Sequence, residues 1–213
     1  MKTFGKGLLV TLMVVMPSSV LAQQTLEVNC TADEGLNTLA AAIEMAAPGD
    51  TIQVTGPCPN TAVTITKDDL TIVGVENAIL EGAAQNRDII DINGARRVVI
   101  EGLTVRGGDD GIIVRRGASA DLNDIVSEGN ADDGFTVVAN AFARIRNGTA
   151  RDNGDDGFTM AFTANAIMSG DMTSTGNADD GIAVVFGSSA EFVAATVLMT
   201  NNGQSATFGS GMF

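Results

Sequence analysis

The chain has 213 residues, of which 45% are hydrophobic, so it can fill the core of one domain and is not expected to be disordered. It has 12 basic and 26 acidic residues, a net charge of −14, and neither Trp nor Tyr, which argues against nucleic acid as its main partner. Because His is absent, mechanisms with an imidazole base and the commonest zinc sites are excluded, which leaves carboxylate chemistry, oxygen-ligated cations or no catalysis.

Residues 1–22 have the pattern of a secretory signal peptide. Lys2 and Lys6 precede an apolar run, Leu8 to Met16, and Val20-Leu21-Ala22 resembles a cleavage site. The run is far shorter than the roughly 20 residues that cross a bilayer, and no later run approaches that length, so no membrane span is predicted in the mature chain. We expect a secreted or periplasmic protein, in which removal of residues 1–22 changes the net charge from −14 to −16.

Residues 23–50 are predicted to form an N-terminal cap. Leu36, Leu39, Ala40, Ile43 and Ala47 follow helical spacing and stop at Pro48-Gly49, which predicts an amphipathic helix over the open apolar end of the domain. In an oxidising compartment the only two cysteines, Cys30 and Cys58, are most simply one disulfide that holds this cap, worth about 3 to 4 kcal/mol in the chain-entropy model.

Residues 51–105 contain short segments rich in β-branched residues and bounded by Gly, Asn or Asp, which are typical of strands. The predicted strands are 51–54, 63–65, 70–72, 89–92, 98–100 and 103–105. Their register is open by one residue, and a slip of one residue would exchange the inner and outer faces.

From residue 109 the chain repeats itself with a spacing of 23, 23 and 24 residues. Asp-Asp-Gly occurs at Asp109-Asp110-Gly111, Asp132-Asp133-Gly134, Asp155-Asp156-Gly157 and Asp179-Asp180-Gly181. The apolar, variable, apolar pattern after each Gly predicts strands with one buried face, at Ile112 and Val114, Phe135 and Val137, Phe158 and Met160, Ile182 and Val184. A second alternating stretch gives the column Val99, Leu122 and Ile145.

The repeat length indicates a solenoid with one coil per repeat. Helix-pair repeats are longer, and the fixed leucine frame of leucine-rich repeats is missing. Stacked coils would place like side chains about 4.8 Å apart, so that Asn130, Asn153 and Asn177 form an internal amide ladder. We therefore predict an all-β parallel β-helix over residues 51–213.

The last coil, 195–205, has Asn201-Asn202-Gly203-Gln204-Ser205 where another Asp-Asp-Gly turn is due, and no capping helix follows it. An uncapped coil would expose unpaired backbone groups. Three explanations stay open: the sequence is truncated at its C-terminus, Phe208, Met212 and Phe213 cover the end, or a partner does, as in end-to-end self-association.

The sequence resembles the right-handed parallel β-helix proteins of the pectin-lyase-like superfamily. The resemblance rests on residues 39–52, 70–74 and 100–105 together with the Asp-Asp-Gly coils. It implies a single-stranded right-handed solenoid, and the active members of the superfamily usually act on acidic polysaccharides. It does not imply one activity, since this superfamily contains lyases, hydrolases, epimerases and adhesins.

The stacked aspartates allow three interpretations. The first is structural, because Asp accepts backbone N–H bonds in turns and Gly gives the backbone freedom. The second is a row of Ca²⁺ sites, for which the candidate ligands are Asp132, Asp133, Asp155, Asp156, Asp179 and Asp180. No other cofactor is expected.

The third interpretation is catalysis by Asp109, Asp110, Asp132 and Asp133, with Arg115 and the neighbouring Arg116 as the candidates for the base of a lyase. Gly108-Asp109-Asp110-Gly111 is similar to a motif of polygalacturonases, but the Gly-His-Gly coil of that family is missing, and Arg144-Ile145-Arg146 only loosely imitates its Arg-Ile-Lys.

The residues that alternate with the inward ones are apolar or Thr, at Ile113, Thr136, Thr159 and Ala183, and predict a flat outer face that meets a glycan, a partner protein or more of the same chain. We therefore expect a protein that binds carbohydrate or another cell-surface component without catalysis. The alternative is a polysaccharide lyase or hydrolase, with or without Ca²⁺, acting on an acidic polysaccharide through the stacked Asp residues.

Overall fold

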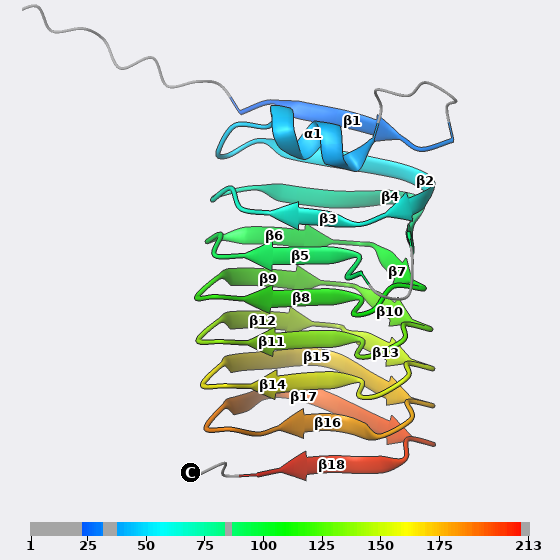
Figure 1. Cartoon of the computed structure of the whole chain (residues 1–213), viewed down its shortest axis with the longest axis vertical. Helices are drawn as coiled ribbons and strands as arrows, with labels where there is room; N and C mark the ends of the chain where they lie inside the picture. The colour runs from blue at the N-terminus through cyan, green and yellow to red at the C-terminus, as the bar shows by residue number, and fades with distance from the viewer. Residues whose placement is uncertain (1–22, 32–37, 84–86, 210–213) are drawn as a thin grey trace, which may run out of the picture.

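The computed structural model describes residues 23–31, 38–83 and 87–209, and shows a parallel β-solenoid of about 8 turns (Figure 1). The predicted signal peptide, 1–22, and Leu36 lie outside the described residues. Successive coils lie one above the other along the long axis, with one helix at the N-terminal end. The predicted fold class is therefore confirmed.

The strands form two parallel sheets. The 11-stranded sheet contains β1 (Thr25–Asn29), β2 (Thr51–Thr61), β4 (Thr71–Gly82), β6 (Val98–Glu101), β7 (Thr104–Arg106), β9 (Ser119–Asn123), β10 (Val126–Glu128), β12 (Phe142–Arg146), β13 (Thr149–Arg151), β15 (Asn165–Thr175) and β17 (Ser189–Thr200). The 7-stranded sheet contains β3 (Val63–Ile65), β5 (Ile90–Asn93), β8 (Ile112–Arg115), β11 (Phe135–Val138), β14 (Phe158–Ala161), β16 (Asp180–Val184) and β18 (Gln204–Phe208).

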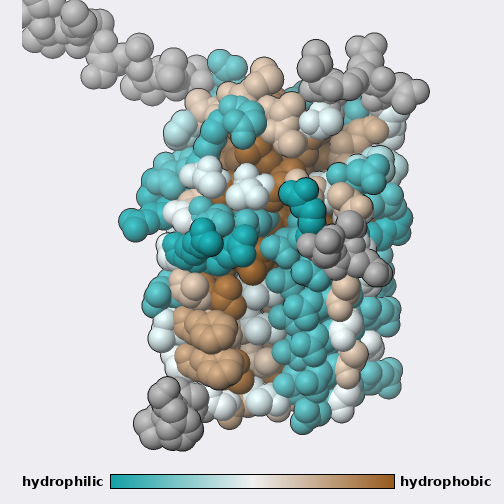
Figure 2. Space-filling view, viewed as in Figure 1, coloured by the Kyte–Doolittle hydropathy of each residue, from teal (hydrophilic) through white to brown (hydrophobic). Residues whose placement is uncertain are grey.

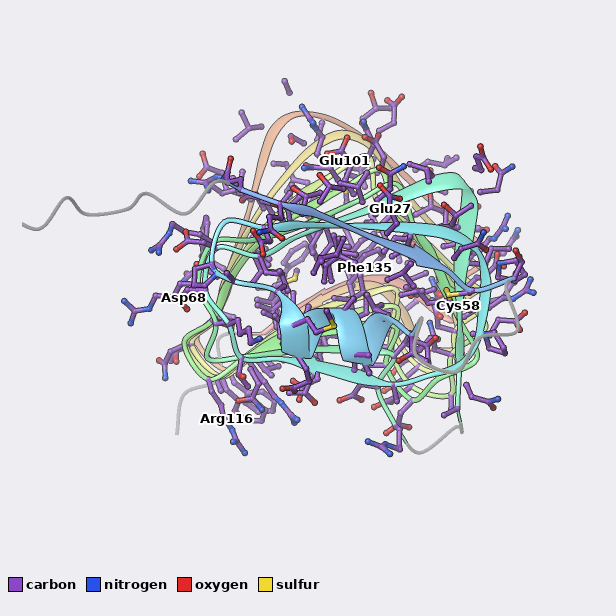
Figure 3. All side chains as sticks on the ribbon, turned by 90° about the horizontal axis from the view of Figure 1, so that it is seen from above. Glu27, Cys58, Asp68, Glu101, Arg116 and Phe135 are labelled. Carbon is purple, nitrogen blue, oxygen red and sulfur yellow. A yellow bond between two sulfur atoms is a disulfide. The ribbon has the colours of Figure 1, made fainter. Side chains whose placement is uncertain are left out.

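The core consists of columns of like side chains, as the repeat predicts. Phe135 pairs with Ile112 on one side and with Phe158 on the other, and Phe158 pairs with Ile182. The rings of Phe135 and Phe158 stack with centroids 4.8 Å apart and planes 5° apart, a contact worth about 0.5 to 1.5 kcal/mol beyond the burial of the rings. Figure 3, viewed along the axis, shows Phe135 inside the coils and Glu101, Asp68 and Arg116 outside.

The predicted column of Val99, Leu122 and Ile145 is wrong at its first member. Leu122 pairs with Ile145 and with Ile100, so Val99 pairs with Asp121 and faces outward. Ile100 and Leu122 are 22 residues apart, whereas the later coils repeat every 23 or 24 residues. The shorter coil shifts the register by the one residue that the sequence left open.

An internal ladder of asparagines joins the coils, also as predicted. The Nδ2 atom of Asn130 donates to Oδ1 of Asn153 at 2.9 Å, Asn153 donates in the same way to Asn177 at 2.8 Å, and Asn177 to Asn202 at 2.9 Å. The first three are buried, so each amide satisfies polar atoms that would otherwise be unpaired in the core.

The glycine of each Asp-Asp-Gly turn is needed for space, not for the backbone freedom that the sequence predicted. None of these glycines has a left-handed φ. A Cβ atom on Gly111 would lie 2.7 Å from the carbonyl oxygen of Gly134 and 2.9 Å from Nδ2 of Asn130. The glycines therefore let the turns approach the asparagine ladder and the coil below.

The helix α1 (Leu39–Met45) covers the N-terminal end, with Leu39, Ala42 and Ile43 buried against the core. Strand β1, which the sequence did not predict, pairs in parallel with β2. The predicted Cys30–Cys58 disulfide is present and ties the residue after β1 to β2. Within the described ranges no helix is both long enough and apolar enough to cross a membrane.

Candidate functional site

The Asp-Asp-Gly turns stack into one column at the start of the strands β8, β11, β14 and β16. Backbone bonds join the turns: the N–H of Asp132 donates to the carbonyl of Asp109 at 3.1 Å, and the N–H of Asp155 to that of Asp132 at 3.0 Å. The predicted catalytic residues Asp109, Asp110, Asp132 and Asp133 therefore lie together, on two neighbouring coils. Figure 2 shows this column as a hydrophilic band running down the molecule.

The second aspartate of each pair belongs to the structure of the turn. Oδ1 of Asp110 accepts the backbone N–H of Asp133 at 3.1 Å, Oδ1 of Asp133 accepts that of Asp156 at 2.9 Å, and Oδ1 of Asp156 accepts that of Asp180 at 2.7 Å. Asp133 and Asp156 also accept bonds from Thr136 and Thr159, at 3.1 and 3.0 Å. These contacts support the structural interpretation of the repeated pairs.

Burial raises the pKa values of several of these carboxyl groups, most of all that of Asp110. Burial, followed by the charge of Asp133, raises the pKa of Asp110 to about 8. Burial also raises the pKa of Asp133 to about 7, although the N–H of Asp156 opposes this. The pKa values of Asp132 and Asp155 are raised as well, by burial and then by neighbouring carboxylates. At neutral pH the column therefore contains both acids and carboxylates.

The first coil of the column borders a cleft of about 440 Å³, in front of β8. Its lining includes Arg87, Asp88, Asp91, Asp109, Asp110 and Arg115. Burial raises the pKa of Asp88. Arg115 is held by Asp91, since Nε donates to Oδ1 at 2.8 Å and Nη2 to Oδ2 at 2.7 Å, and this bonding raises the pKa of Arg115. A guanidinium fixed in this way remains protonated, so it neutralises charge in the cleft and is poorly suited to take a proton.

The predicted calcium ligands form two overlapping groups. One oxygen from each of Asp132, Asp133 and Asp155 can lie within 4.8 Å of the others, and the same holds for Asp155, Asp156 and Asp179. Carboxylate oxygens this close can share a hard cation, and Asp155 belongs to both groups. The sixth predicted ligand, Asp180, is in neither group.

Asp180 differs from its equivalents because the following turn is shorter. The turn Asn202-Gly203-Gln204-Ser205 has one residue fewer than the turn Asn177-Ala178-Asp179-Asp180-Gly181. The backbone N–H of Gln204 donates to the backbone carbonyl oxygen of Asp179 at 2.7 Å. The shorter turn lacks a counterpart of Asp180, which in the earlier coils is the residue whose N–H bonds to the preceding carboxylate. Oδ1 of Asp180 is therefore buried without a hydrogen-bond partner among the described residues.

The outer face of the 7-stranded sheet is less open than the sequence predicted. Ile113, Thr136 and Ala183 point outward but are buried, and Thr159 is half-buried. The strands of this sheet have three to five residues, so the turn aspartates on one side and the coils above and below cover much of its surface. The prediction of a flat exposed face was therefore wrong. The face is a narrow surface between the aspartate column and the turns that follow β8, β11, β14 and β16.

The turns after β14 and β16 carry two aromatic side chains that were not predicted from the sequence. Phe162 and Phe186 follow β14 and β16, are 58% and 52% exposed, and stack with ring centroids 4.8 Å apart and planes 3° apart. Figure 2 shows the apolar patch on this face, to the left of the hydrophilic column. The sequence signal was two phenylalanines 24 residues apart at the turn position that Arg116 and Ala139 occupy in earlier coils.

The backbone at these phenylalanines is strained. Phe162 has a φ of 56° and Phe186 a φ of 51°, in the left-handed region that Asn and Gly occupy most easily. An L-residue there costs on the order of 1 to 3 kcal/mol. Arg116 and Ala139 have the same conformation in the earlier coils, so the repeat sets the backbone and the unusual feature is the choice of Phe. Two large apolar rings are thus kept in solvent at backbone positions that disfavour them.

A family model described as "Right handed beta helix region" matches residues 57–197. The comparison with curated proteins found no match, and neither did the comparison with solved structures. The family model covers coils from β2 to β17, including all four Asp-Asp-Gly turns. On this match, over more than half of its length, the chain belongs to the right-handed β-helix family.

Proposed function

We propose that this protein is an exported carbohydrate-binding protein that holds a polysaccharide across the outer face of its 7-stranded sheet. The observation that carries the proposal is the exposed, strained stack of Phe162 and Phe186 beside a column of hydrogen-bonding carboxyl groups. Export is supported by the signal-like residues 1–22 and by the Cys30–Cys58 disulfide.

The binding face has the phenylalanine stack on one side and the aspartate column on the other, and these match the C–H groups and the hydroxyl groups of a sugar. The C–H groups of a pyranose pack on aromatic carbon, whose π face is electronegative, and its hydroxyl groups bond to carboxylates and hydroxyls. The strand β14, which separates Asp156 from Phe162, has four residues and spans about 13 Å. Ala139, one coil before Phe162, ends at its Cβ and places no ring on the free face of Phe162.

The charge of the face favours neutral polysaccharides over acidic ones. Within the part of the chain that the structure describes, no arginine bonds to Asp132, Asp155 or Asp179, whereas the first coil has the Arg115–Asp91 pair. An anionic chain would be repelled unless cations shared by the aspartates offset the charge. Calcium should therefore matter for acidic ligands and not for neutral ones.

Retardation in native gels that contain soluble polysaccharides tests this proposal. The panel includes neutral glucans and mannans, polygalacturonate and alginate, each with calcium and with a chelator. We expect retardation by at least one neutral polysaccharide, loss of retardation in Phe162→Ala and Phe186→Ala, and no loss in Phe142→Ala. Phe142 is a matched control, because it is a partly exposed phenylalanine on the other sheet. A mobility unchanged by every polysaccharide would exclude the proposed function.

A second candidate function is hydrolysis of a polysaccharide at the cleft before β8. The raised pKa of Asp110, about 8, is the observation that favours it, because a general acid must hold its proton at neutral pH. Product release from the same panel, lost in Asp110→Asn, would support hydrolysis; binding without product release would support the first proposal. Asn keeps an oxygen for the N–H of Asp133, so this variant preserves the turn.

A further inference from the structure

The coil formed by β17 and β18 differs from the others in having a free edge. β17 pairs with β15, and β18 pairs with β16. Among the described residues no strand pairs with the opposite edges of β17 and β18, so their outward backbone N–H and C=O groups have no sheet partner. Such an edge is a ready template for another strand.

The core columns of the solenoid also reach solvent at this coil. By register, Phe192 lies below Met168, Val197 below Met172 and Phe208 below Val184, and these three upper residues are buried. Their counterparts in the terminal coil are 39%, 36% and 67% exposed. These side chains therefore occupy core positions that no further layer covers among the described residues.

The charge of this coil restricts what can cover it. Residues 189–208 contain a single ionisable side chain, Glu191, in a chain with a net charge of −14. Depletion of charge with exposed Phe, Val and Leu is typical of the centre of a protein interface. A second copy would be repelled at most of the acidic surface, but two terminal coils can meet with little repulsion and mutually cover their apolar ends.

We infer that a second copy of this chain covers the terminal coil, in a two-fold end-to-end dimer. The two copies contribute the same surface, and the paired edges run antiparallel across the contact. The opposite end of the solenoid is covered by α1, whose Leu39, Ala42 and Ile43 close the core there. The contact therefore closes at two copies and does not propagate into a filament.

Sedimentation equilibrium of the purified protein tests the dimer. We expect twice the mass of one chain at high concentration and the mass of one chain on dilution. Val197→Lys and Phe208→Lys place charges in the contact and should yield single chains at every concentration. Phe162→Lys, which removes an exposed apolar ring from the side of the solenoid, is the control and should still dimerise.

Hydrogen exchange keeps the inference falsifiable if either lysine variant unfolds the terminal coil. In the unmodified protein, the amides of residues 189–208 should exchange more slowly as concentration rises, while the amides of β8 and β11 should not change. A protein that sediments as one chain at millimolar concentration, or whose terminal-coil exchange is independent of concentration, would overturn the inference. Dimerisation and polysaccharide binding can fail separately, because they use different surfaces.

Discussion

Phe162 and Phe186 show how one residue can act against the local preference of the backbone. Both are left-handed turn residues, and the earlier coils place Arg116 and Ala139 at the same position, so the fold does not require an aromatic ring there. The rings gain stability from stacking on each other, but they lose it through backbone strain and exposure. Binding of a ligand that covers the rings gives a physical reason for this arrangement.

Replacement of Phe162 by Asn separates the two roles. Asn adopts the left-handed conformation easily, which offsets the lost stacking of about 0.5 to 1.5 kcal/mol. We expect the free energy of unfolding in urea to change by less than about 1 kcal/mol, and polysaccharide retardation to be lost. Large destabilisation with unchanged retardation would show instead that the ring is structural.

The buried aspartates predict an unusual dependence of stability on pH. The pKa of Asp110 is raised from 3.8 to about 8 and that of Asp133 to about 7, so the folded state binds protons more tightly than the unfolded state. Stability from these groups is fully present below pH 3.8 and is lost as pH rises toward 8.

Urea denaturation from pH 4 to pH 9 measures this effect. The contribution of Asp110 makes the free energy of unfolding fall with rising pH, and Asp110→Asn should flatten the curve and stabilise the protein by at least about 1 kcal/mol at pH 9. Asp121→Asn, at a half-exposed aspartate of β9 that pairs with Arg144 on the surface, should leave the slope unchanged. Equal slopes in Asp110→Asn and the unmodified protein would contradict the assignment.

At the scale of elements, ladders between coils provide much of the order. The asparagine column connects consecutive coils, with Asn153 accepting from both the backbone and the side chain of Asn130. A second ladder on the surface alternates charge, with Arg106 bonded to Glu81 and Arg151 to Glu128. The buried asparagine ladder should contribute more to the free energy of unfolding than the surface ladder, because exposed ion pairs contribute about 0 to 1 kcal/mol each.

Asn153→Ala should destabilise the protein by about 2 to 3 kcal/mol, because the buried backbone N–H of Asn130 and one of its side-chain N–H groups lose their acceptor. Asn165→Ala, at an exposed position of β15, should cost less than about 1 kcal/mol. Urea denaturation compares the two variants. Equal effects would mean that the internal ladder adds no more than a surface amide.

The aspartate column predicts stabilisation by calcium. A site with a dissociation constant of 0.1 mM would, in 10 mM calcium, stabilise the folded state by about 2.7 kcal/mol and raise Tm by about 5 to 10 °C. Asp155→Asn should abolish the shift, because Asp155 belongs to both oxygen groups, whereas Asp121→Asn should retain it. The absence of a shift in the unmodified protein would exclude the calcium sites.

At the scale of the whole molecule, the sequence predicts the solenoid well, because like residues recur at the coil length and each strand alternates with period two. The core columns at Phe135 and Phe158 and the ladder at Asn153 follow from that rule alone. The burial of Thr136 could not be predicted in this way, because it depends on the Asp133 carboxyl group, which lies over the strand and accepts a bond from the Thr136 hydroxyl. The Phe162–Phe186 pair was missed because turns, unlike strands, carry no alternation that marks their side chains.

The most direct test of the account is the affinity of the best-retained polysaccharide of the panel, measured by titration calorimetry for the unmodified protein and for the double variant Phe162→Ala/Phe186→Ala. Loss of two stacking contacts of about 1 kcal/mol each predicts an affinity at least tenfold lower. The melting temperature of the variant should stay within a few degrees of the original. An unchanged affinity in a folded double variant would contradict the proposed binding face.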